Sequence, residues 1–463
     1  MMYPRLVVAG THSGVGKTTV TLALLAAFRA KGRKVQPFKV GPDFIDPGHH
    51  RLACGRESRN VDGWMLGSVL NRSIFQEAAH DADLSVIEGM MGLFDGSSPT
   101  QEIGSTAEIA KQLNAPVVLV VDGSAMARSA AAMVYGYAKF DPALHIAGVI
   151  FNRIKSEGHY QLLKQAVEKE TDVSVLGYFR PDSDLTIPDR HLGLRTALEG
   201  LGTDLYSKLG QSASETIDMP RVEDLAKSNQ DWSYAISNTP PESSESITKP
   251  VRIGVAYDPA FCFYYPDNLV LLEKAGGKLC RFSPIKDLSL PNVDMLYLGG
   301  GYPEIYAEAL EHNVGMRESI QAFAAKGGVI YAECGGLMYL ANTLRDFDGK
   351  IYDMVGVIPA ETEMSRTHMT LGYRELTLTQ TGLLGEQGMR IRGHEFHYSV
   401  LHPQRALEYV GQIIDAQGHS RGGDGIMVGN VTALYTHLHF ASHPHLPRAL
   451  VEAARGKTAR MKA

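Results

Sequence analysis

The sequence predicts an α/β protein built from two units that are joined by a polar linker. Three observations predict it. Short runs rich in β-branched residues alternate with helical stretches over the first two hundred residues. Residues 210–250 are rich in Ser, Glu, Asn and Pro, a composition that buries little apolar surface. The alternation restarts after residue 250, and 463 residues are too many for one compact core.

The first unit, 1–209, has the pattern of a parallel sheet with helices on both faces. Its strands read as nearly continuous apolar runs, which is typical of strands that are buried on both sides. The expected strands are Leu6–Ala9, Val35–Val40, Leu84–Ile87, Val117–Val121 and Ala147–Phe151, with helical spacing over Thr18–Ala30 and Ala125–Tyr137.

The second unit, 251–445, repeats the strand–helix pattern. Strands are expected at Arg252–Ala256, Met295–Leu298 and Val329–Ala332, and a helix at Asn268–Ala275. The remaining segment, 446–463, ends in RGKTARMKA, which we interpret as a basic tail that frays.

Composition excludes several classes of protein. Lys and Arg number 45 against 51 Asp and Glu, a net charge of −6, so a surface that coats nucleic acid is not expected. The four cysteines form no CxxC pair, which argues against a zinc knuckle or a disulfide framework. The start of the chain lacks signal-peptide character, and the longest apolar runs, such as Leu22–Phe28, are too short for a bilayer. We expect a soluble cytoplasmic protein.

A phosphate-binding loop follows the first strand, in the segment GTHSGVGKTT at 10–19. Gly14 and Gly16 allow backbone N–H groups to approach phosphate oxygens, and Lys17 places a positive charge on them. The Thr18 hydroxyl suits Mg²⁺, and Thr19 completes the motif. The strict motif has glycine where Thr11 stands, but the strand–turn–helix context is intact. The segment therefore predicts an ATP site.

Polar residues follow the next strands at the carboxyl edge of the expected sheet, where ligands of open α/β sheets bind. Asp43 and Asp46 are interpreted as Mg²⁺ or substrate contacts, with turn formation around Pro42 and Pro47 as the alternative. Glu88 is the stronger metal candidate, because a carboxylate after an apolar strand is costly unless it is paired. Asn152 either reads the adenine edge or caps a turn.

A candidate nucleophile lies in the second unit, in the segment VIYAECGGLM. Cys334 stands at a sharp strand-to-helix turn, where free N–H groups and the helix dipole favour a thiolate. Gly300 and Gly301 follow an upstream strand, and with Gly335 their amides can form an oxyanion hole. A base is then needed, and the segment YTHLHF supplies His437 and His439.

Taken together, these motifs resemble the cobyrinate a,c-diamide synthase family over essentially the full chain. The first half resembles dethiobiotin synthetase, a P-loop NTPase-type fold, and the second resembles the class I glutaminase domain of cobyric acid synthase. The matching segments are GTHSGVGKT, GPDFIDP, VIEGMMGLFDG, GVIFNR, IPDRHLGL, LYLGGGYPE, YAECGGLMYL, RGHEFHYS and YTHLHF.

The resemblance implies a ligase that uses ATP, Mg²⁺ and glutamine to convert corrin-ring carboxylates into amides in cobalamin biosynthesis. It places Lys17, Thr18, Asp46 and Glu88 around ATP and Mg²⁺, with Asp43 near the transferring phosphate or the substrate. Cys334 attacks glutamine, and His437 activates the thiol.

Several points stay open at this level. Related glutaminases carry Glu two residues after the catalytic histidine, where this chain has His439, so the group that orients His437 is unidentified. The segment His394–Tyr398 matches a family signature without an assigned role. Hydrogenobyrinate and Ni-sirohydrochlorin are alternative substrates, cobyric acid synthase is an alternative activity, and a ParA/MinD-like ATPase switch is the rival from another class. A second copy of this chain, as a homodimer, is a candidate partner.

Overall fold

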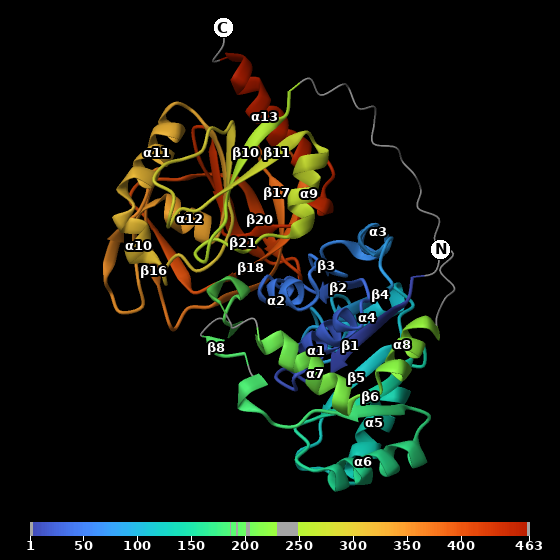
Figure 1. Ribbon diagram of the computed structural model, residues 1–463. Helices are drawn as coiled ribbons and strands as arrows, with labels where there is room; N and C mark the ends of the chain where they lie inside the picture. The colour runs from blue at the N-terminus through green and yellow to red at the C-terminus, as the bar shows by residue number, and fades with distance from the viewer. Residues whose placement is uncertain (1–2, 186, 191–192, 201–203, 229–248, 461–463) are drawn as a thin grey trace. The chain divides into compact units, whose positions relative to one another are not determined.

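The computed structural model describes residues 3–185, 187–190, 193–200, 204–228 and 249–460. The chain divides into two compact units, Met1–Asn238 and Thr239–Ala463, which we call unit 1 and unit 2. Both are α/β folds (Figure 1). The predicted fold class is therefore confirmed.

Unit 1 is built on a seven-stranded parallel sheet within its described residues, in the order β3-β2-β4-β1-β5-β6-β7. The order reverses around β1, so the loop after β1 opens at the topological switch point where α/β sheets bind ligands. The strands are β1 (Arg5–Gly10), β2 (Val35–Val40), β3 (Arg59–Val61), β4 (Leu84–Glu88), β5 (Val117–Asp122), β6 (Ile146–Asn152) and β7 (Ser174–Tyr178).

Helices cover both faces of this sheet. Alternate strand residues point to opposite sides: Leu6 and Val8 belong to one core, and Val7 and Ala9 to the other. The first core contains α1 (Lys17–Ala30), α2 (Ile45–Cys54), α7 (Asp204–Thr216) and α8 (Met219–Ser228); the second contains α3 (Gly67–Ala79), α4 (Thr106–Gln112), α5 (Ser129–Phe140) and α6 (Glu157–Glu170). Between β7 and α7 lie the short elements η1 (Ser183–Leu185), β8 (Asp189–Arg190), β9 (Gly193–Leu194) and η2 (Ala197–Glu199).

The start of the expected linker differs from the structure, because residue 210 lies inside α7. α7 packs on α1 so closely that a Cβ on Gly210 would lie 3.0 Å from the carbonyl carbon of Ala26. α8 follows, and Val222 and Leu225 are buried in the same core. The polar composition of 210–250 as a whole concealed the apolar faces of these two helices. The remainder of the expected linker, 229–248, lies outside the described residues.

Unit 2 contains a ten-stranded mixed sheet within its described residues, in the order β11-β10-β12-β13-β22-β21-β20-β17-β18-β23. The first five strands are parallel, and the pairs from β22 onward are antiparallel. In sheet order the strands are β11 (Gly277–Phe282), β10 (Val251–Ala256), β12 (Met295–Leu298), β13 (Val329–Glu333), β22 (Val431–Leu434), β21 (Ser420–Val428), β20 (Glu408–Asp415), β17 (Thr370–Leu378), β18 (Arg390–His397) and β23 (His437–Leu438).

A second, four-stranded sheet, five α-helices and one 3₁₀ helix complete unit 2 in the described residues. The small sheet consists of β15 (Ile351–Asp353), β14 (Ala341–Arg345), β16 (Ile358–Met364) and β19 (Ser399–Pro403). One core contains α10 (Ala307–His312), α11 (Val314–Ala325) and α12 (Gly335–Leu340), and the other contains α9 (Pro266–Lys274), η3 (Phe440–Ser442) and α13 (Leu446–Arg460).

The expected basic tail begins as a packed helix rather than a frayed end. α13 buries Leu446, Leu450, Val451 and Ala454 against the sheet. Their spacing places them on one face of a helix, a stripe that the basic residues around them masked. Among the described helices, none has the length and apolar character that would be needed to cross a membrane.

Candidate active sites

The phosphate loop of unit 1 joins β1 to α1 and has the backbone that the motif requires. Gly14 and Gly16 adopt φ values of 77° and 100°, the left-handed region that favours glycine. Lys17 begins α1, and its side chain bends back over the loop to donate to the His12 carbonyl at 3.2 Å. The lysine is therefore already at the loop where phosphates would bind.

Asn152 and Arg153 hold this loop from the end of β6. The Asn152 amide donates to the Val15 carbonyl at 2.9 Å and accepts from the Arg153 N–H at 2.9 Å, so it serves the loop and a turn. Arg153 donates to the Gly14 carbonyl at 2.8 Å and pairs with Asp122. Of the two interpretations of Asn152, these contacts favour the capping one.

The predicted metal residues converge beside the loop. The Thr18 hydroxyl donates to Glu88 Oε1 at 2.7 Å and lies 3.4 Å from Asp46 Oδ2. The buried Lys39 ammonium contacts the same two carboxylates, at 2.5 Å for Asp46 and 2.9 Å for Glu88. A cation therefore already neutralises this pocket.

His50 completes the cluster. Its Nε2 lies 2.6 Å from Glu88 Oε2, and its Nδ1 lies 3.0 Å from the Ser58 hydroxyl. Burial favours the neutral carboxyl, but Lys39 and His50 outweigh it and hold the pKa of Glu88 well below its usual range. Burial and the neighbouring carboxylates, Asp43 and Glu88, raise the pKa of Asp46.

Sequence reasoning did not assign Lys39 or His50 to the site. A signal for Lys39 was present, since a lysine near the end of the apolar strand VQPFKV is costly unless it is paired. His50 carried no comparable signal, because its partner Glu88 is distant in the sequence.

Asp43 performs the turn role that was the alternative interpretation. Its Oδ1 accepts from the backbone N–H groups of Ile45 and Asp46, at 2.8 and 3.0 Å, at the start of α2. Its Oδ2 lies 3.8 Å from the Lys39 ammonium. The carboxylate therefore caps the helix and also faces the charged cluster.

Magnesium, which the family resemblance implies, suits these residues. No group of three or more His, Cys, Asp or Glu side chains among the described residues is arranged as a metal site. Mg²⁺, however, commonly takes one or two carboxylates together with substrate phosphates and water. The Thr18, Asp46 and Glu88 oxygens provide such an incomplete, hard-oxygen donor set.

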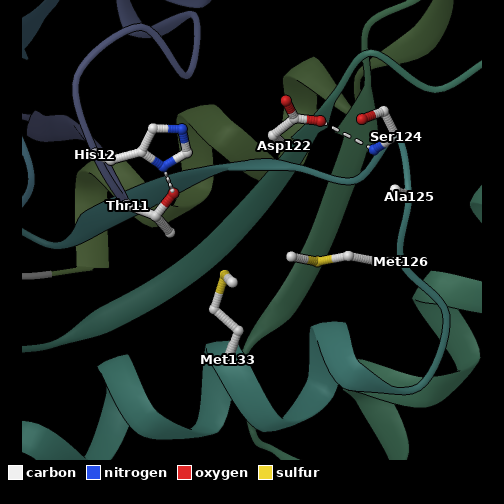
Figure 2. A pocket seen from close by; sticks show the side chains of 7 residues that line it. All are labelled: Thr11, His12, Asp122, Ser124, Ala125, Met126 and Met133. Carbon is white, nitrogen blue, oxygen red and sulfur yellow. Dashed lines mark hydrogen bonds between the residues drawn. The ribbon is translucent and has the colours of Figure 1, made fainter.

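A cavity of about 250 Å³ opens beside the start of the phosphate loop. Figure 2 shows Thr11 and His12 on one side of this space, and Met126 and Met133 on another. Asp122, at the end of β5, accepts from the Ser124 N–H at 3.0 Å within the same lining. The cavity adjoins the phosphate loop through Thr11 and His12.

Cys334 of unit 2 occupies the expected sharp turn between β13 and α12. Its φ of 46° and ψ of −101° are strained for a residue other than glycine, as in a nucleophile elbow. The Cys334 N–H donates to the Leu434 carbonyl at 2.7 Å, which ties the turn to the neighbouring strand β22. The residue is 5% exposed.

The thiol differs from the sequence expectation of a favoured thiolate. Burial raises the pKa of Cys334, and the nearby carboxylates of Glu304 and Glu333 contribute to the rise. The six residues of α12 provide only a short dipole to oppose these effects. The resting thiol is therefore protonated and needs a base.

The glycine run after β12 lies against the Cys334 turn. The Gly300 carbonyl accepts from the N–H groups of Cys262 and Phe263, both at 3.0 Å. A trans peptide directs its C=O and N–H oppositely, so the Gly301 N–H points away from these donors. The Gly301 nitrogen would lie 3.1 Å from a Cβ on Gly335, the residue after the cysteine. The three predicted oxyanion residues are thus adjacent.

His437 lies beside the same glycine run. A Cβ on Gly300 would come within 2.3 Å of the His437 Cε1 atom, so only glycine leaves room for the imidazole. His437 is 1% exposed, and burial lowers its pKa to about 3. The ring is therefore neutral at physiological pH, as a base must be.

Two polar side chains position the segment that carries His437. Asp424 accepts from the Tyr435 N–H, the Thr436 N–H and the Thr436 hydroxyl, at 3.0, 3.0 and 2.6 Å. Asn268 donates to the Leu438 carbonyl and accepts from the Phe440 N–H, both at 2.8 Å. Asn268 is distant in the sequence from the residues that it holds, and Asp424 lies on the neighbouring strand β21 outside the histidine motif, so motif analysis missed both.

The segment His394–Tyr398, which had no assigned role, forms part of this site. The His394 ring stacks on the His437 ring, with centroids 5.2 Å apart and planes 22° apart. The Tyr265 hydroxyl lies 3.0 Å from His394 Nδ1, and the Tyr265 ring lies 4.5 Å from that of His439. His439 therefore packs on a tyrosine within the same buried cluster.

Two family models match this chain, one in each unit. Residues 6–194 match the family model of the CobQ/CobB/MinD/ParA nucleotide binding domain, and residues 252–445 match that of the CobB/CobQ-like glutamine amidotransferase domain.

Curated relatives align with nearly the whole of this chain. A cobyrinate a,c-diamide synthase of Syntrophotalea carbinolica is 46% identical, covering 99% of this chain and 100% of that protein. The enzymes of the same name from Priestia megaterium and Salmonella typhimurium are each 43% identical, over 97% of this chain and 96% and 98% of their own lengths.

Proposed function

Because this chain belongs to the cobyrinate a,c-diamide synthase family, we propose that it amidates the a and c acetate carboxylates of cobyrinate at the expense of ATP. The chain is a glutamine-dependent carbon–nitrogen ligase of cobalamin biosynthesis. The observation that carries the detailed proposal is the presence, in one chain, of a phosphate loop facing buried carboxylates and of a strained cysteine next to a glycine run that adjoins an imidazole.

The first half-reaction activates a carboxylate, which is a poor electrophile at neutral pH. A carboxylate oxygen of the corrin acid attacks the γ-phosphorus of ATP, and ADP leaves, giving an acyl phosphate. Such a transfer depends on positioning and charge neutralisation. Lys17 and the N–H groups of Gly14, Gly16 and Thr19 hold the phosphates, while Asn152 keeps the loop in shape.

Thr18, Asp46 and Glu88 would hold Mg²⁺, which when bound neutralises charge on the phosphates. Lys39, which contacts both carboxylates, is then available to the transferring phosphoryl group. Asp43 caps α2 and faces Lys39, so it acts by placing that ammonium and the incoming acid.

The second half-reaction supplies nitrogen through a thioester. His437 takes the proton of the Cys334 thiol, the sulfur attacks the glutamine amide carbon, and the proton passes to the departing ammonia. The N–H groups of Gly301 and Gly335, placed by Gly300, stabilise the oxyanion. Water then releases glutamate, and ammonia displaces phosphate from the acyl phosphate to give the amide.

The alternatives carry less support. A ParA/MinD-like switch would leave the second half of the chain unexplained, because that half matches a glutamine amidotransferase domain and contains the strained cysteine. Hydrogenobyrinate and Ni-sirohydrochlorin share the chemistry, but the full-length relatives bear the cobyrinate name. Cobyric acid synthase is disfavoured for the same reason.

Substrate choice can be tested directly. The protein is given MgATP, glutamine and, in parallel, cobyrinate, hydrogenobyrinate or Ni-sirohydrochlorin, and the products are weighed. We expect two carboxyl-to-amide conversions on cobyrinate at the highest rate; a faster conversion of either competitor would overturn the substrate assignment. With cobyrinate labelled by ¹⁸O in its carboxylates, one label per amide should appear in phosphate, and its absence would exclude the acyl phosphate.

A cysteine variant tests the division of labour. Cys334→Ala should abolish glutamine-dependent synthesis while ammonia-dependent synthesis stays within about twofold of the parent protein, because the acid is activated elsewhere. Cys280→Ala, which changes a half-buried cysteine on β11, is the matched control and should leave both nitrogen sources usable. Glutamine-dependent synthesis by Cys334→Ala would remove the cysteine from the mechanism.

A further inference from the structure

A buried carboxylate, that of Glu333, lies near His437 at the end of strand β13. Glu333 is the last residue of β13, directly before Cys334, and it is 1% exposed. Side chains of successive strand residues point to opposite faces. Its carboxylate enters the aromatic core, where the Tyr331 hydroxyl donates to Oε1 at 2.5 Å and the Tyr297 hydroxyl donates to Oε2 at 3.1 Å.

The carboxylate lies near the His437 imidazole and also holds the backbone of the next residue, Leu438. Glu333 Oε2 lies 3.8 Å from His437 Nδ1, and Oε1 accepts from the Leu438 N–H at 3.1 Å. Residues that are more than a hundred positions apart meet here because β13 pairs with β22, which leads into β23. Catalytic hydrogen bonds are often long before substrate binds, so 3.8 Å is within reach of a closed contact.

The other surroundings leave the ring little freedom. His394 stacks on one face of His437, in register across β18 and β23. Gly300 abuts its Cε1 atom. A carboxylate at Nδ1 then determines which nitrogen carries the proton in the neutral ring, leaving Nε2 to accept a proton from the thiol.

We propose that Glu333 is the positioning residue for His437, supplying the carboxylate that residue 439 does not supply in this chain. This inference rests on the proposed roles of Cys334 and His437. When His437 takes the thiol proton, the imidazolium forms next to an anion that already receives three hydrogen bonds. The glycine run and the carboxylate therefore stabilise opposite charges that develop in the same step.

The proposal predicts a specific pH dependence. Burial raises the pKa of Glu333 to about 7, although the hydrogen bonds from two tyrosine hydroxyls and the Leu438 N–H lower it in part. Below that pH, the protonated carboxyl no longer stabilises the imidazolium, so the glutaminase rate falls as the pH falls through about 7. The ionisable groups that face Glu333 from the surrounding elements are Tyr264, Tyr297, Tyr331, Cys334, Asp424 and His437.

Glu333→Gln tests the proposal, because the amide preserves the size of the side chain and removes its charge. We expect the kcat of glutamate release to fall at least 100-fold, the KM for glutamine to change less than threefold, and the acid limb near pH 7 to disappear. Synthesis with ammonia should be unchanged. The control is Glu361→Gln, which alters a carboxylate on β16 that pairs with Arg345 of β14. This variant should retain the parent pH profile.

Tyr297→Phe provides a second, milder test in case Glu333→Gln does not fold. The change removes one hydrogen bond to the carboxylate. Because that bond favours the ionised form, its loss should move the acid limb to higher pH, with full activity recovered above it. An unchanged pH profile in Tyr297→Phe, or a parental kcat in folded Glu333→Gln, would overturn the inference. Since Cys334→Ala is scored separately, this outcome leaves the proposed function intact.

Discussion

Replacing Gly300 by alanine tests the fit between the glycine run and the catalytic imidazole. The added Cβ would lie 2.3 Å from the His437 Cε1 atom, whereas ordinary contact begins at 3.4 Å, so the ring must move by about 1.1 Å. His394 already stacks against the ring, so this movement changes the direction of the base. The φ of Gly300 is accessible to alanine, and the backbone N–H groups are retained.

A misplacement of about 1 Å in a catalytic group costs on the order of 100-fold in rate, or about 2.7 kcal/mol of transition-state stabilisation. We therefore expect Gly300→Ala to release glutamate about 100-fold more slowly, with ammonia-dependent synthesis unchanged. The rates are measured on the same preparation with each nitrogen source at saturation.

Gly382→Ala is the matched control, because nothing lies within 4 Å of the Cβ that it adds. It should have the parent rates. If Gly300→Ala hydrolyses glutamine within threefold of the parent protein, the close approach of Gly300 and His437 does not govern the base. Equal losses with glutamine and ammonia would point to misfolding and equally refute the reasoning.

Three further predictions concern the remaining contacts. Glu88→Gln should lower synthesis with either nitrogen source by at least 100-fold while glutamate release continues, because Thr18, Lys39 and His50 lose their shared anion; parental synthesis would remove Glu88 from the ATP site. Gly16→Ala should raise the KM for ATP at least tenfold, because the φ of Gly16 is 100° and the added Cβ would lie 2.1 Å from Asn152 Nδ2. The control Gly158→Ala adds a Cβ in open space and should leave this KM unchanged. Equal KM values in the two variants would contradict the loop assignment. Asp424→Asn should speed hydrogen exchange of the Tyr435 and Thr436 amides by about 10–100-fold, since an unsatisfied buried donor costs about 1–3 kcal/mol. Mass spectrometry of the segment that carries these amides measures the exchange, and an unaltered rate would show that Asp424 does not hold the segment.

The strand–helix alternation was sufficient to predict the α/β class, the strands β1, β2, β4, β5 and β6 of unit 1, and the strands β10, β12 and β13 of unit 2. Val35–Val40 and Met295–Leu298 have the bounds that the apolar runs indicate, because buried parallel strands are apolar on both faces. The antiparallel strands β17, β18, β20 and β21 were not predicted. They mix polar and apolar residues, and their pairing depends on partners elsewhere in the chain.

The candidate sites divide along the same line. Local motifs identified Lys17, Cys334 and the glycine run, because a loop and its neighbouring helix or strand are contiguous in the sequence. Lys39, Glu333 and Asp424 were missed because their significance depends on pairing across the sheets. The roles of all of these residues in turnover stay predictions until the variants are measured.

The position of α7 and α8 has a practical consequence for dissecting the two halves. A fragment that ends near residue 209, as the polar composition suggests, would cut through α7 and remove α8 from the nucleotide-binding half. It would leave the apolar surface of α1 in contact with water, and exposed patches of this kind drive aggregation. Expression of that half by itself should extend at least to Ser228, the last residue of α8.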